Sequence, residues 1–126
     1  IPANKIMQAQ GARFYENFIY ANASIIPSNC LVFTFDPTLF NINNRPATQF
    51  SNLSYISNPA GYANFSREWK CMAIDYGYWC ESTTPSEKSY CNSVINLFNT
   101  SLITAATLNN SYTHATYSIY RINGLR

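Results

Sequence analysis

The chain has 126 residues, a length typical of one domain, and its 16% aromatic content argues against disorder. Charged residues make up only 11% of the chain, against about 25% in an average soluble domain, so amides and hydroxyls must hydrate most of its surface. The eight basic residues form no run, which excludes the usual electrostatic footprint of a nucleic-acid-binding protein.

Four segments in the first half of the chain have a recognisable pattern. Residues 4–24 carry apolar side chains at helical spacing and predict an N-terminal helix. The apolar run at 31–35 is typical of a buried strand, and 39–42 predicts a second short strand. Residues 49–57 are predicted to be extended and half-buried.

Two further strands are predicted in the second half. Residues 67–76 alternate between two faces and give the strongest strand pattern in the chain. Residues 77–83 are predicted to form a loop. Residues 112–122 alternate again and predict a C-terminal strand.

A second long helix is predicted over about 85–108. Thr84 and Glu87 form a capping box, and Pro85 suits the first helical position. Apolar residues then recur at helical spacing. The opposite side of this helix would carry no charge, so we expect it to pack on a partner subunit or under glycan, unless it is the polar back of a core helix. Its residues are Asn92, Asn96, Thr100, Ile103, Thr104 and Thr107.

These segments together predict one α+β domain over residues 1–126. The N-terminal helix, an antiparallel or mixed sheet of four to five strands, the helix at about 85–108 packed on the sheet and the C-terminal strand follow in that order. We expect the helices to cover one face of the sheet. No apolar run long enough to span a membrane is present.

The four cysteines, Cys30, Cys71, Cys80 and Cys91, predict two disulfides formed in an oxidising compartment, with free buried thiols as the alternative. Three pairings are open. The strand positions favour a Cys30–Cys71 tie, which leaves Cys80 and Cys91 to pin the loop to the long helix. No Cys-x-x-Cys pair occurs, so we expect no metal site and no cofactor.

Five Asn-x-Ser sequons predict N-glycosylation, although composition alone would give about three. Asn52 and Asn64 lie near predicted turns and are the strongest candidates. Asn109 follows the predicted helix, Asn22 is a further candidate within the helix predicted over 4–24, and Asn99 would lie within the second helix and be the weakest. The alternative is that these are ordinary residues of an Asn-rich chain.

Tyr76, Tyr78 and Trp79 form an aromatic segment between a predicted strand and Cys80. Clustered Tyr and Trp supply a large contact area at low entropy cost, which suits a surface that stacks on sugar or inserts into a partner. The alternative is that Trp79 covers the core beside a disulfide.

The sequence offers little for catalysis. His114 is the only histidine, and no nucleophile elbow, phosphate loop or dinucleotide loop occurs. Asp75, Glu68 and Glu81 are candidate paired carboxylates, but their spacing equally suits solvated charge. We therefore expect a non-enzymatic protein, with a small secreted hydrolase using His114 and a carboxylate as an alternative.

The segment Ile1-Pro2-Ala3, followed by Ala9-Gln10, resembles the part of type IV pilins just after their apolar N-terminal half-helix. The order of helix, sheet and late cysteines also resembles a pilin headgroup. This resemblance implies, as a second alternative, a pilin-like subunit lacking that half-helix.

The composition, cysteines and sequons favour a secreted or surface-exposed glycoprotein with a structural or adhesive role. Such a domain would serve as a filament or coat subunit or as a receptor-binding domain of a cell or virion surface. Its partners would be other protein subunits, or a surface receptor or glycan, with no nucleic acid and no membrane span.

Overall fold

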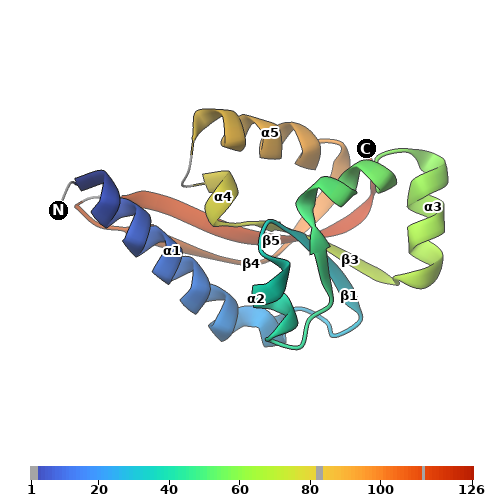
Figure 1. Ribbon diagram of the computed structural model, residues 1–126. Helices are drawn as coiled ribbons and strands as arrows, with labels where there is room; N and C mark the ends of the chain where they lie inside the picture. The colour runs from blue at the N-terminus through green and yellow to red at the C-terminus, as the bar shows by residue number, and fades with distance from the viewer. Residues whose placement is uncertain (1–2, 82–83, 112) are drawn as a thin grey trace.

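A five-stranded mixed sheet forms the centre of the protein (Figure 1). The computed structural model describes residues 3–81, 84–111 and 113–126. The strand order is β2-β1-β3-β5-β4, with β2, β1 and β3 parallel to one another and β5 antiparallel to both neighbours. The strands are β1 (Cys30–Thr34), β2 (Ala47–Gln49), β3 (Cys71–Tyr76), β4 (Phe98–Asn109) and β5 (His114–Leu125).

Within the described residues, five α-helices and two 3₁₀ helices surround the sheet. They are α1 (Ala3–Asn22), η1 (Ala23–Ile25), α2 (Pro37–Asn41), η2 (Phe50–Ile56), α3 (Pro59–Glu68), α4 (Tyr78–Glu81) and α5 (Pro85–Ile95). Asp36, Asn58 and Thr84 cap α2, α3 and α5 by accepting a hydrogen bond from a backbone N–H three residues on. A proline follows each cap, where its missing N–H costs nothing. None of the helices in the described residues is long and apolar enough to cross a membrane.

Both faces of the sheet are covered. On one face, α1 and α2 bury Phe18, Ile19 and Phe40 against the sheet. On the other, η2, α4 and α5 contribute Phe50, Leu53, Ile56, Cys80 and Cys91 to a second core. The expectation of helices on one face only is therefore wrong. Every residue of β1 and β3 is buried, as in parallel strands that are sandwiched between helices.

The predicted fold class is confirmed. The N-terminal helix, the strand following Cys30, the strand ending at Tyr76 and the C-terminal strand are all present, and the sheet is of the mixed kind. The strand predicted over 67–76 begins only at Cys71, because residues 67–68 still belong to α3. The predicted order of these elements also holds.

The helix predicted over about 85–108 is wrong in its second half. α5 ends at Ile95, and β4 takes over from Phe98 to Asn109 as the partner of β5. The pairing of β4 with β5 has register shifts at Asn99/Thr100 and at Leu102/Thr104. Each shift interrupts the two-residue alternation of a strand, so apolar side chains recur at helix-like intervals. The β-branched Thr and Ile of this stretch favour the strand.

Three shorter predictions are also corrected. Residues 39–42 belong largely to α2, because the Asp36 cap and Pro37 start a helix there. Residues 49–57 form mainly η2 instead of an extended segment, and its buried side chains are Phe50, Leu53 and Ile56. The predicted loop after β3 contains α4, and residues 82–83 of that loop lie outside the described residues.

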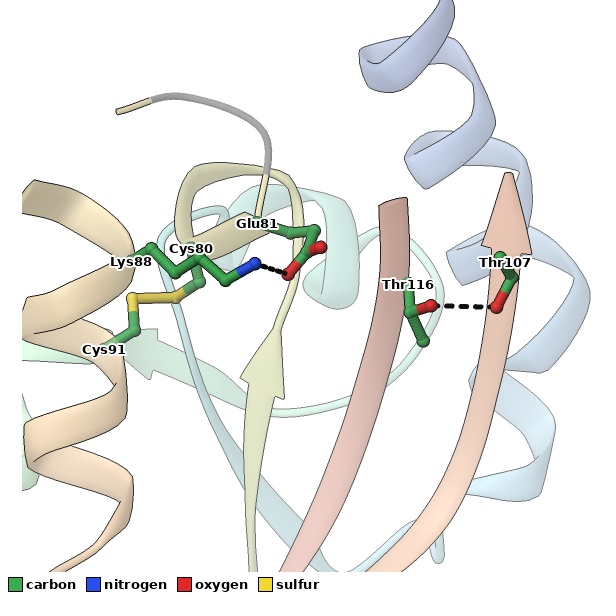
Figure 2. Close-up of polar contacts among 6 residues, drawn as sticks. All are labelled: Cys80, Glu81, Lys88, Cys91, Thr107 and Thr116. Carbon is green, nitrogen blue, oxygen red and sulfur yellow. Dashed lines mark hydrogen bonds and ion pairs between the residues drawn. A yellow bond between two sulfur atoms is a disulfide. The ribbon is translucent and has the colours of Figure 1, made fainter. Parts of the chain in front are cut away.

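The two disulfides join the cysteines in the favoured pairing. Cys30 and Cys71 are register partners on β1 and β3, with their Cα atoms 4.2 Å apart. Cys80 and Cys91 tie α4 to α5, with their Cα atoms 5.7 Å apart (Figure 2). An ion pair between Lys88 Nζ and Glu81 Oε2, at 3.2 Å, lies beside the second disulfide. The first disulfide therefore joins β1 to β3 within the sheet, and the second joins α4 to α5.

Candidate functional site

A carboxyl group lies buried between α1 and the sheet. Asp75 on β3 is only 2% exposed. Its Oδ2 accepts hydrogen bonds from the Tyr15 hydroxyl on α1 and from Thr34 Oγ1 on β1, the latter at 2.7 Å. Asp75 Oδ1 has no hydrogen-bond partner within the part of the chain that the structure describes. Within the described residues, the cluster therefore gives hydrogen-bond partners to Oδ2 of the carboxylate and none to Oδ1.

This environment favours the protonated acid. Burial raises the pKa of Asp75 from 3.8 to about 7, an effect that the hydrogen bonds from Tyr15 and Thr34 oppose and the charge of Asp36 reinforces. Burial also raises the pKa of Tyr15 well above its ordinary value, and the neighbouring Asp75 adds to this shift. Tyr15 therefore stays a donor, and Asp75 is the group that changes charge near neutral pH.

Gly77 makes room for this cluster. A Cβ atom on Gly77 would lie 2.8 Å from Tyr15 Cζ and 2.9 Å from Asp75 Oδ2. Both separations are too short for real Cβ contacts. A larger residue at this position would displace Tyr15 or Asp75.

A surface hollow of about 180 Å³ lies beside the cluster. Its lining residues, Ala12, Tyr15, Glu16, Asp36, Tyr78 and Trp79, come from α1, from the segment after β1 and from α4. We call it the aromatic hollow. Tyr15 belongs both to its wall and to the buried cluster. The hollow therefore has the Asp75 carboxyl behind its wall.

The predicted aromatic segment is split between two places. Tyr78 and Trp79 pack edge to face, with ring centroids 6.0 Å apart, and both line the aromatic hollow. Tyr76 does not join them. It is the last residue of β3 and faces the other core, because successive strand residues point to opposite faces. Trp79 is 47% exposed, so about half of its surface is open to solvent.

Sequence reasoning missed Tyr15, Thr34, Glu16 and Asp36 as members of this site. Asp75 was visible as a carboxylate within an apolar strand, and a charge at such a position signals a buried partner. The partner could not be named, since Tyr15 lies 60 residues away. Only the fold brings α1 over β3.

Asn64 and Asn109 are exposed sequon residues. Asn64 is exposed on α3, where its Oδ1 accepts from Arg67 at 3.3 Å. Asn109 is exposed at the end of β4. Both remain predicted glycosylation sites.

The other three sequon amides donate hydrogen bonds within the protein. Asn22 Nδ2 bonds to the Phe18 carbonyl, and its Oδ1 accepts from Thr104. Asn52 Nδ2 bonds to Thr48 Oγ1 at 2.6 Å. Asn99 Nδ2 bonds to the carbonyl oxygen of Leu125 on β5 at 3.2 Å. Asn99 therefore lies on an exposed strand, not within a helix as predicted.

The candidate catalytic groups are dispersed. His114 is exposed at the start of β5, and no carboxylate in the described residues lies within ion-pair distance of it. Asp75 is buried under α1, Glu68 ends α3, and Glu81 pairs with Lys88. The described residues contain no cluster of metal-ligating side chains.

β4 is the longer of the two edge strands of the sheet within the described residues. β4 is the terminal strand of the sheet and has 12 residues, whereas β2 at the other end has three. Its sequence, FNTSLITAATLN, contains neither charge nor proline. From Thr104 to Asn109 its register with β5 is unbroken, and Thr107 and Thr116 join side chains across the pair at 2.9 Å (Figure 2).

Comparison with protein-family models, curated proteins and solved structures gives no match for this chain.

Proposed function

We propose that this protein is a non-enzymatic, extracellular structural or adhesive domain, acting as a filament or coat subunit. In this proposal the β4 edge pairs with a strand of a neighbouring copy. The observation that carries it is a 12-residue edge strand without a charged residue, of which six residues are exposed.

Proteins that remain monomeric usually protect such edges. Inward-pointing charge, Lys, Pro, bulges or very short strands discourage strand addition. β4 has two irregularities, at Asn99/Thr100 and Leu102/Thr104, but its last six residues are regular. Two copies of an uncharged strand can also pair without placing like charges opposite each other.

Other features support an assembly outside the cell. The two disulfides are consistent with an oxidising compartment. Only 11% of the residues are charged, and this low content lowers the electrostatic cost of packing copies side by side. Ala105 and Thr107 are exposed within the regular part of β4, next to the edge that would pair.

Sedimentation velocity of Ala105→Lys tests this proposal. Wild-type protein should form concentration-dependent oligomers, and one Lys on β4 should weaken their association at least about tenfold. Ser89→Lys is the matched control, since Ser89 is exposed on α5 and the same charge is added away from the edge.

Thermal unfolding of both variants should show that the fold is retained. Wild-type protein that stays monomeric at all attainable concentrations would contradict assembly through β4. Equal effects of the two Lys substitutions would also contradict it, because net charge and not the edge would then be responsible.

A further inference from the structure

We propose that the aromatic hollow binds a small organic cation, an alkylammonium group, between Trp79, Tyr78 and the carboxylates of Glu16 and Asp36. This site is separate from the β4 edge and does not depend on assembly.

Negative charge is concentrated around this hollow. The chain has six acidic residues, and two of them, Glu16 and Asp36, lie in its wall. Among the side chains that the structure describes, the one ion pair is Lys88–Glu81, so neither Glu16 nor Asp36 is in an ion pair there. The overall charge of the chain is nevertheless +2, which makes the local concentration of carboxylates more pronounced.

The positions of the Asp36 and Glu16 carboxylates show where a ligand would bind. Asp36 Oδ1 accepts the Leu39 N–H as the cap of α2, which fixes the carboxylate in place. Glu16 is exposed on α1, with Ala12 and Tyr15 beside it in the wall. A cation in the hollow would lie between carboxylates from two different elements. It would contribute charge-assisted hydrogen bonds or Coulomb attraction to both.

The aromatic rings select an organic cation over a hydrated ion. Ammonium groups are attracted to the faces of Trp and Tyr within about 6 Å of the ring centroid, and aromatic cages bind quaternary ammonium groups in this way. Tyr15, Tyr78 and Trp79 all line this hollow. A metal ion is disfavoured because no group of three metal-ligating side chains occurs in the described residues.

The size of the hollow indicates one head group. Its volume of about 180 Å³ is below the roughly 300–1,000 Å³ of most ligand pockets. A trimethylammonium or lysine-like ammonium group fits this scale better than a whole sugar or nucleotide. The ligand is therefore expected to enter by its cationic end and to leave its remainder in solvent.

An NMR titration with tetramethylammonium chloride tests this inference on the intact protein. The indole N–H of Trp79 and the amides of Glu16 and Asp36 should shift saturably, whereas sodium chloride at equal ionic strength should not shift them in this way. Choline and a short lysine-containing peptide are titrated separately. Tighter binding of choline would indicate a free small-molecule ligand, and tighter binding of the peptide would indicate a lysine side chain of another protein.

Two variants remove charge without removing the fold. Asp36→Asn keeps a side chain that caps α2 well, and Glu16→Gln changes an exposed residue. Each should weaken tetramethylammonium binding about three- to tenfold, in line with the loss of one charged contact. Glu87→Gln, on α5, is the control and should leave the affinity unchanged.

Several results would overturn the inference. The absence of a saturable shift with tetramethylammonium, or an equal shift with sodium chloride, would exclude an organic-cation site. Tighter binding of a neutral methyl glycoside would assign the hollow to sugar instead. Unchanged affinity in both charge variants would show that the carboxylates play no part.

Discussion

The Tyr15 hydroxyl donates a hydrogen bond to Oδ2 of Asp75, and this bond links α1 to the centre of the sheet. Most of the surrounding contact between α1 and the sheet is apolar. Burying a carboxyl group in such an apolar interface costs little free energy when the group is protonated and much more when it is charged. The docking of α1 is therefore expected to depend on pH.

Stability should fall as the pH rises through neutrality. The pKa of Asp75 is raised from 3.8 to about 7 in the folded protein, so folding favours the protonated form. Its contribution is fully present below about pH 4 and lost by about pH 8, with a decrease in the free energy of unfolding of up to about 4 kcal/mol. Urea unfolding at a series of pH values measures this decrease.

Asp75→Asn is the control for that series. The amide is neutral at every pH, so the variant should lose this part of the dependence while other groups keep theirs. Asp36→Asn, which retains Asp75, should preserve most of it. A wild-type protein whose stability increases between pH 5 and 8 would contradict the assignment of this pH dependence to Asp75. An Asp75→Asn variant with the same pH dependence of stability as wild type would also contradict it.

Gly77→Ala should destabilise the same cluster. The new methyl group would overlap Tyr15 and Asp75, and overpacking of this kind costs about 1–3 kcal/mol. The loss should be accompanied by a changed tyrosine signal in the near-ultraviolet circular dichroism spectrum. An unfolding free energy equal to that of wild type would show that the space at Gly77 is not needed.

The two disulfides should stabilise the protein unequally. Cys30 and Cys71 are separated by 41 residues and Cys80 and Cys91 by 11. Loop-closure entropy then predicts losses of about 4 and about 3 kcal/mol when each pair is changed to Ser. Chemical unfolding of the two double variants measures them. A larger loss for the shorter loop would show that native contacts of α4 and α5, and not chain entropy, dominate.

Glycan occupancy should follow the freedom of the side-chain amide, because the glycan is attached at Nδ2. Protein secreted from a eukaryotic cell should carry glycans at Asn64 and Asn109. Forms modified at Asn22, whose Nδ2 binds the Phe18 carbonyl, should be depleted. Peptide mass spectrometry before and after glycosidase treatment measures each site. Full occupancy of Asn22 with an empty Asn64 would contradict this ranking.

Local patterns in the sequence predict much of the fold. The apolar run of β1, the alternation of β5 and the Thr84 cap of α5 each depend on neighbouring residues, and all three are present. The cysteine pairing also follows, because Cys30 and Cys71 flank or lie in strong strands.

What the sequence hides depends on contacts between distant residues. The sequence predicts a helix where β4 lies, because the register shifts distort the strand alternation. Only the pairing with β5 identifies this segment as a strand. The Tyr15–Asp75 bond and the aromatic hollow join segments far apart in the chain. Neither has a local pattern that would reveal it.

Hydrogen exchange of β4 in dilute and in concentrated protein tests assembly through this edge most directly. Assembly through the edge predicts that amides within Phe98–Asn109 become at least about tenfold more protected as oligomers form, since an added strand would bind their outward N–H groups. The short β2 strand at the other edge should change little. Oligomers that form while the protection of β4 stays the same would contradict the proposed role of this strand.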